Sequence, residues 1–164
     1  MKALLVIVCL LVPLAAYADT LSGRVVSVAD GDSITVLVER EQIKVRLIEI
    51  DAPEKKQAFG NKSKQALADM VFGKDVQVEV HGKDKYRRTL GRVLVNGLDA
   101  NAEMVRQGYA WVYRKYSKNH DLLRLEAEAR ETRRGLWFDA EPIPPWEWRK
   151  TKKPWGTDGA LTDK

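Results

Sequence analysis

Cysteine and histidine are scarce in this chain of 164 residues, and no apolar run is long enough to span a bilayer. The only cysteine, Cys9, lies in a segment that we expect to be removed. The mature chain therefore has no thiol for a disulfide, a thiolate zinc site or a cysteine nucleophile. His81 and His120 lie far apart, which excludes a local histidine metal motif. The longest apolar run, residues 3–16, falls short of the about 20 residues that a membrane-spanning helix needs.

The N-terminus has the pattern of a secretory signal peptide. Lys2 precedes the apolar run, and Ala16-Tyr17-Ala18 supplies small residues at the two positions that signal peptidase reads. Cleavage after Ala18 lowers the net charge from +5 to +4, because Lys2 is the only charged residue removed. We therefore expect a secreted or periplasmic protein with no stable membrane association after cleavage.

Composition divides the chain into three parts: a signal peptide at 1–18, a domain at 19–140 and a C-terminal tail at 141–164. The tail is rich in proline, tryptophan and lysine. Two arrangements are open for it: it lies along the domain through its tryptophans, or it is loose. We expect it to be loose beyond about Lys150.

Apolar and polar residues alternate in five short segments, which is typical of β-strands. Helical spacing and glycine stops predict three helices. The expected strands lie within residues 21–26, 34–38, 43–47, 76–80 and 93–95, and the expected helices at 61–72, 99–107 and 122–134. Ile48 and Ile50 break the alternation of the third strand, which indicates a bulge or a strand that curls into a barrel. The order favours a small Greek-key barrel of the α+β class.

An acidic segment lies within this basic protein. Residues 30–54 contain seven acids and three bases, whereas the rest of the mature chain is strongly basic. A basic surface attracts phosphates, and carboxylates inside it repel them unless a cation is bound. Carboxylate oxygens are hard ligands that favour Ca²⁺ or Mg²⁺. Ile34 and Thr35 stand at positions that exclude an EF-hand loop after Asp30.

The segment from Arg46 to Glu54 makes the case for a site more specific. Pro53 disfavours helix at Ala52, so Asp51, Ala52 and Glu54 emerge from a strand end in defined directions. Arg46 has apolar neighbours and needs an anionic partner, either a structural carboxylate or a substrate phosphate. The other acids of this segment, Glu39, Glu41 and Glu49, are expected on the solvent faces of strands.

These segments together resemble the thermonuclease family, the calcium-dependent staphylococcal-nuclease-like enzymes. The resemblance extends from about Leu21 to Trp137. Its matching motifs are residues 28–33, 45–54, 84–88 and 101–109, the last followed by an aromatic run. The family fold that it implies is a five-stranded OB-type β-barrel with about three α-helices, which agrees with the order of elements above.

The resemblance implies a calcium site. Asp32 and Asp51 would bind Ca²⁺ with their carboxylates, and the Ala52 carbonyl would be a further ligand. Asp30 corresponds to a nearby acid that acts indirectly. Ser33 replaces the threonine that is commoner in the family and keeps its hydroxyl.

The resemblance also implies the catalytic and substrate-binding residues. Glu54 would orient or deprotonate the attacking water, while Arg46 and Arg88 would hold the phosphate. Arginine forks match phosphate geometry, and this chemistry needs no covalent nucleophile. The residues expected to contact the nucleotide are Lys85, Tyr86, Arg87, Tyr113 and Tyr116. Arg87 stands where a glycine is common, so it either shares the role of Arg88 or alters the loop before it.

The sequence thus predicts a monomeric Ca²⁺-dependent nuclease that hydrolyses DNA and RNA, single strands more readily than duplexes. The family comparison implies 3′-phosphate products. Two other functions are open: a non-catalytic nucleic-acid-binding OB domain and a polyanion-binding protein of the cell envelope. The filled acidic positions, Glu54 above all, favour the enzyme.

Overall fold

The computed structural model describes residues 19–151. The expected signal peptide lies outside these residues, and so does all but Thr151 of the tail segment expected to be loose beyond about Lys150. The strands within this range are β1 (Thr20–Asp30), β2 (Ser33–Val38), β3 (Glu41–Leu47), β4 (Ile50–Asp51), β5 (Asp75–Lys83), β6 (Thr89–Val95), β7 (Leu98–Asp99) and β8 (Trp111–Val112). The helices are α1 (Gly60–Val71), α2 (Ala100–Arg106), α3 (His120–Glu131), a 3₁₀ turn (Gly135–Phe138) and α4 (Pro145–Thr151).

Five of the strands close into a barrel. The sheet order is β3-β2-β1-β5-β6-β7, and β3 also pairs in parallel with β6, which joins the two sides of the sheet. The predicted α+β class and five-stranded barrel are confirmed. The three expected helices correspond to α1, α2 and α3, and α4 is a further helix that the alternation pattern did not predict.

The barrel interior is filled by the residues that alternate along its strands. Val36, Val45, Val78 and Val93 are all fully buried, and Val25 is 1% exposed. Burying branched apolar side chains on one face of each strand is what fixes the register of the pairs.

The third strand is interrupted where the alternation breaks. β3 ends at Leu47, and Glu49 takes a left-handed backbone conformation with φ of 65°. β4 then leaves the barrel and pairs with β8, so Asp51 lies opposite Trp111. Glu49 itself is not on a solvent face as expected, because it pairs with Arg92 at 3.0 Å and accepts a hydrogen bond from Ser117.

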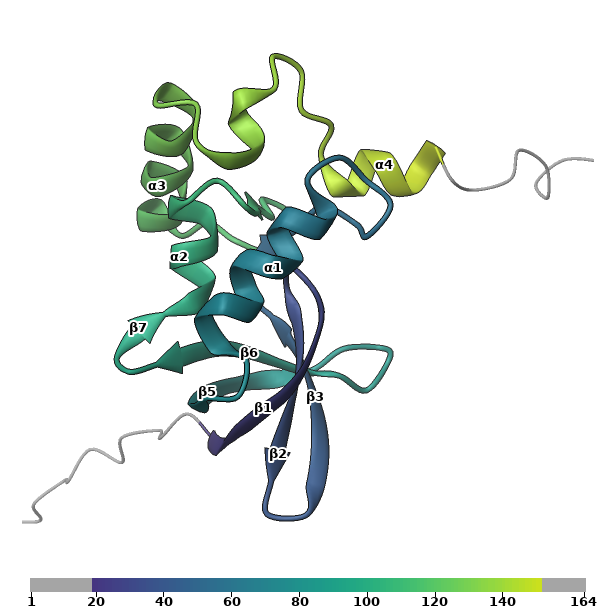
Figure 1. Ribbon diagram of the computed structural model, residues 1–164, viewed down its shortest axis with the longest axis vertical. Helices are drawn as coiled ribbons and strands as arrows, with labels where there is room; N and C mark the ends of the chain where they lie inside the picture. The colour runs from purple at the N-terminus through teal and green to yellow at the C-terminus, as the bar shows by residue number, and fades with distance from the viewer. Residues whose placement is uncertain (1–18, 152–164) are drawn as a thin grey trace, which may run out of the picture.

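The helices cover one end of the barrel (Figure 1). α1 crosses above β1, with α2 and α3 stacked beside it, and α4 lies near the loop that precedes α1. Trp146 of α4 packs against Trp111 and Tyr113, with ring centroids 5.6 and 5.5 Å apart, so this part of the tail lies along the domain through a tryptophan. Among residues 19–151, no helix has the length and apolar character needed to cross a bilayer.

Candidate functional site

The turn between β1 and β2 presents the first carboxylate of the site. The Asp30 carboxylate accepts a hydrogen bond from the Asp32 amide at 3.1 Å, which shapes the turn. Gly31 is required because a Cβ there would lie 1.9 Å from the hydroxyl oxygen of Ser63 on α1. The first turn of α1 therefore packs directly against the backbone that carries Asp32.

Asp32 is buried, and both of its carboxylate oxygens accept hydrogen bonds. Its side chain is 2% exposed, and one carboxylate oxygen accepts the Ala52 amide at 2.7 Å. The other oxygen accepts the Ser33 hydroxyl at 3.1 Å and contacts the guanidinium of Arg46. The Asp32–Ala52 bond holds the β1–β2 turn against the segment that follows β4.

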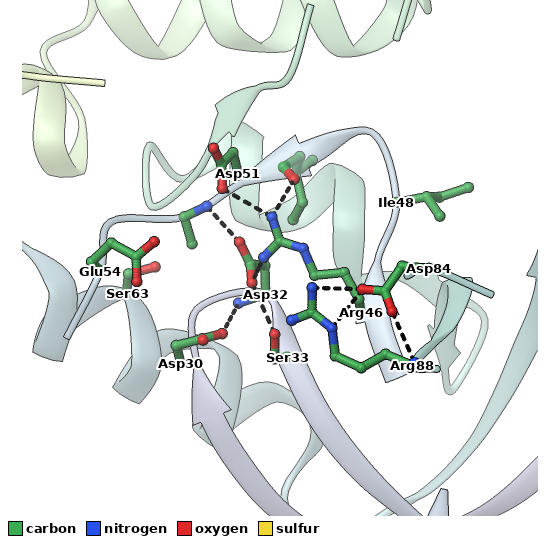
Figure 2. A network of polar contacts seen from close by, with 12 residues as sticks. Asp30, Asp32, Ser33, Arg46, Ile48, Asp51, Glu54, Ser63, Asp84 and Arg88 are labelled. Atoms are coloured by element: carbon green, nitrogen blue, oxygen red, sulfur yellow. Dashed lines mark hydrogen bonds and ion pairs between the residues drawn. The ribbon is translucent and has the colours of Figure 1, made fainter. Parts of the chain in front are cut away.

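Arg46 joins the two aspartates (Figure 2). One terminal nitrogen contacts Asp32, and the other donates to Asp51 at 2.9 Å. The Asp51 side chain is 1% exposed. Structural carboxylates are therefore partners of Arg46 in this structure, and the two acids lie within the width of one guanidinium group.

Glu54 lies on the exposed side of this cluster. A second guanidinium, that of Arg149 on α4, donates to Glu54 at 2.8 Å and to both oxygens of Asp51 at 3.2 and 2.7 Å. The hydrogen bonds with Asp51, opposed by burial and reinforced by Glu54, raise the pKa of Arg149 above its ordinary value. The sequence analysis did not identify Arg149 as a site residue.

Arg88 pairs with Asp84 and not with an acid of the carboxylate cluster. Arg88 directly precedes β6, and the first residues of β6 pair with Val45 and Arg46 of β3. Its guanidinium binds Asp84 at 2.7 Å (Figure 2), and the Asp84 carboxylate also accepts the backbone amides of Tyr86 and Arg88. Burial raises the pKa of Asp84, but these hydrogen bonds outweigh it and leave that pKa below its usual value.

The β5–β6 loop carries the other residues of the 84–88 motif. Arg87 has φ of 64°, the left-handed conformation that glycine adopts without strain, so a glycine would fit the backbone at this position. Lys85 lies over the ring of Tyr86 at 5.0 Å, and the Tyr86 side chain is exposed.

The two remaining predicted contacts lie in the segment that follows β8. Tyr113 and Tyr116 form an edge-to-face pair with centroids 4.9 Å apart. Tyr113 also stacks on Trp146, with ring planes 4° apart. A cavity of about 570 Å³ borders this stack and is lined by Tyr113, Arg114, Lys115, Trp146, Arg149 and Lys150. Trp111 belongs to the core and is 6% exposed.

The donor set of the two aspartates fits a hard divalent cation. Their carboxylates already face one shared cationic group, Arg46, and the Ala52 carbonyl follows Asp51 directly. Between Asp19 and Thr151, however, no three or more acidic, histidine or cysteine side chains gather to hold a metal ion by themselves. An ion here would complete its coordination with the Ala52 carbonyl, water and substrate oxygens, which is common for Ca²⁺ and Mg²⁺.

Two residues that support the site were not predicted from the sequence. Asp84 had a signal, since an aspartate four positions before an arginine in a polar turn often accepts backbone amides. No local sequence pattern pointed to Arg149, because its contacts with Asp51 and Glu54 join residues 98 and 95 positions apart.

The fold and the site together define a class: a small closed β-barrel whose rim brings buried carboxylates and arginines to one place, as phosphate chemistry requires. Residues 44–139, more than half of the chain, match the family described as staphylococcal nuclease homologues. The chain belongs to this family, and the predicted family is confirmed.

Several proteins are similar to the chain over most of its length. It is 46% identical to "Protein ParB" of Escherichia coli over 161 residues, covering 92% of this chain and 90% of the relative. It is 44% identical to a "Micrococcal nuclease" of Shigella flexneri over 164 residues, covering 93% and 94%. An "Uncharacterized endonuclease" of Escherichia coli O157:H7 is 48% identical over 131 residues, covering 79% and 86%.

Proposed function

We propose that this protein is a secreted or periplasmic Ca²⁺-dependent nuclease that hydrolyses phosphodiester bonds in DNA and RNA. It acts as a monomer, prefers single strands and leaves 3′-phosphate ends. Family membership and relatives described as a micrococcal nuclease and an endonuclease support the nuclease activity. The calcium, the substrate preference and the location rest on the resemblance and the N-terminal sequence.

One observation carries the proposal: Arg46 lies between the buried carboxylates of Asp32 and Asp51, and Glu54 belongs to the same cluster through Arg149. Phosphodiester hydrolysis needs charge stabilisation at the phosphoryl oxygens and a base close to the attacking water. An acid pair, an adjacent arginine and a more exposed third acid supply groups for each of these tasks.

Each residue then has a defined part. Asp32, Asp51 and the Ala52 carbonyl would hold the ion, which when bound supplies Lewis-acid polarisation of the phosphate and orients the substrate. Glu54, whose side chain is 39% exposed, accepts the proton of the attacking water. Arg46 has the fork geometry that holds phosphate oxygens, and Arg88 joins it once it exchanges Asp84 for the phosphate.

Substrate strands leave the cluster over two flanks. On one flank Lys85, Tyr86 and Arg87 occupy the β5–β6 loop, and on the other Tyr113 and Tyr116 stand beside Trp146. Aromatic side chains stack on unpaired bases, which is the physical reason to expect preference for single strands.

The direct test incubates purified mature protein with denatured DNA in calcium, in magnesium and in chelator. We expect degradation in calcium and intact DNA in chelator. Intact DNA under all three conditions, with retarded gel mobility, would instead identify a non-catalytic nucleic-acid-binding barrel.

The role of Glu54 is tested with Glu54→Gln. This variant should fold and bind DNA normally but lose about 10²- to 10⁴-fold in rate, because glutamine keeps the shape of the side chain but cannot accept the proton. Glu128→Gln is the matched control, since Glu128 lies on α3 in an exposed pair with Arg124. Wild-type turnover by Glu54→Gln would refute its role as the base.

A further inference from the structure

Arg149 reaches the candidate metal site from a helix outside the matched family segment. The match ends at residue 139, and α4 begins at Pro145. The Arg149 guanidinium binds both carboxylate oxygens of Asp51 and one oxygen of Glu54. One side chain of the tail thus contacts an expected metal ligand and the expected base at the same time.

The position of Arg149 is set by an anchored segment. Trp146 stacks on Tyr113 and packs edge-on against Trp111. The Gln57 side chain, in the loop that follows Glu54, donates to the carbonyl of Ile143 at 2.6 Å. The neighbouring cation on α4, Lys150, pairs with Glu147 of the same helix at 2.8 Å. The anchored helix therefore delivers Arg149 to the acidic cluster, while Lys150 stays on the helix surface.

We propose that Arg149 is the resident counter-cation of the metal site, and that a divalent ion must displace it from Asp51 and Glu54. The proposal rests on the proposed function, because it assumes that the ion binds at Asp32 and Asp51. It makes Arg149 a positioning residue that weakens ion binding and holds Glu54 in an ion pair until the ion arrives.

Arg149 and the divalent ion compete first because both bind the carboxylate oxygens of Asp51. A calcium ion contacts its oxygen ligands at about 2.3–2.6 Å. Both Asp51 oxygens already accept from Arg149, and one of them also accepts from Arg46. An ion that bonds to these oxygens takes the space of the guanidinium nitrogens.

Arg149 and the ion also compete because both neutralise the negative charge of the same acids. Asp32, Asp51 and Glu54 carry three negative charges, and two guanidiniums face them. A divalent ion added to this set makes the cluster positive, whereas exchange of Arg149 for the ion makes it neutral. Since the coupling is reciprocal, the ion weakens the Arg149 contacts by the same factor as Arg149 weakens ion binding.

The displacement requires only a side-chain rotation. The Arg149 side chain is 41% exposed, so it can turn to solvent while the Trp146 stack keeps α4 in place. The released guanidinium remains close to the site, which it re-enters when the ion leaves.

The test measures calcium binding to the full mature chain by titration calorimetry, without substrate. Arg149→Gln should bind calcium roughly ten-fold more tightly than wild type, as expected for removing a unit positive charge beside a divalent ion. Lys150→Gln is the matched control: it removes the adjacent cation of the same helix and should leave the affinity within about two-fold.

A second variant tests the anchor. Trp146→Ala removes the stack that positions α4 and should also tighten calcium binding. The double variant with Arg149→Gln should gain nothing over Arg149→Gln alone, because both changes remove one effect. An independent gain from the two changes would show that Trp146 does not act through Arg149.

The outcomes separate this proposal from the proposed function. Equal or weaker calcium binding by Arg149→Gln overturns the displacement, since a merely structural role for Arg149 predicts no gain. The nuclease proposal survives that result if the protein binds calcium. If neither wild type nor Arg149→Gln binds calcium, both proposals fail.

Discussion

Replacing Arg46 with methionine tests how the two buried aspartates are held. Methionine keeps most of the side-chain length but removes the charge that Asp32 and Asp51 share. Removing one partner of a buried ion pair costs about 3–5 kcal/mol, because the remaining charge stays buried without compensation. Here Asp32, 2% exposed, loses its partner guanidinium, whereas Asp51, 1% exposed, keeps the hydrogen bonds from Arg149, so the cost falls mainly on Asp32. We therefore expect Arg46→Met to lose at least about 3 kcal/mol, a large share of the ~5–15 kcal/mol typical of a domain.

The assay is urea unfolding in chelator, with Arg24→Met as the matched control. Arg24 pairs with Asp75 at 3.2 Å, but the two side chains are 61% and 76% exposed, so this variant should unfold at nearly the same urea concentration as wild type. In calcium the deficit of Arg46→Met should shrink, because the bound ion supplies the missing positive charge and stabilises the folded state. Equal unfolding free energies of the two variants in chelator would refute the reasoning.

Three further changes test other parts of the structure. Asp84→Asn should cost about 1–2 kcal/mol at pH 7, because Arg88 loses its charged partner. The pKa of Asp84 is lowered in the folded state. The difference in unfolding free energy between wild type and Asp84→Asn should therefore be complete above the ordinary pKa of about 4 and disappear as the pH falls through the folded-state pKa. A constant difference in unfolding free energy down to pH 2 would contradict this. Arg87→Gly should raise the melting temperature by a few degrees, because glycine adopts a φ of 64° without strain, and a lower melting temperature would argue against strain there. Asn101→Ala should cost about 2–3 kcal/mol in urea unfolding. The buried Asn101 side chain accepts a hydrogen bond from the Val93 amide and donates to the carbonyls of Ile48 and Gly91. A loss under about 1 kcal/mol would show that water replaces the Asn101 side chain in these hydrogen bonds.

Local sequence patterns were sufficient to predict the barrel strands, because apolar and polar residues alternate within each strand. The five predicted strands lie within β1, β2, β3, β5 and β6, and the break at Ile48 and Ile50 corresponds to the end of β3. The prediction for Glu49 was wrong, because a polar residue in a strand pattern gives no information on backbone conformation. Its left-handed φ turns the chain, and Arg92 and Ser117 then bind its side chain.

The cluster of Asp32, Arg46, Asp51 and Glu54 was predictable because three of its members lie within nine positions of one another. A turn and a proline fix their directions, and the resemblance adds Asp32. Arg149 was not predictable for the opposite reason. Its link to Asp51 depends on the packing of α4 through Trp146, which joins residues from three distant segments and has no periodic signature.

The most direct test of the account is a crystal structure of the mature protein grown with calcium. The account predicts an ion bound by the carboxylates of Asp32 and Asp51 and the carbonyl of Ala52, at about 2.3–2.6 Å, with Arg149 turned away from Asp51. Calcium bound elsewhere, or an Asp51 that still holds both guanidiniums at saturating calcium, would contradict it.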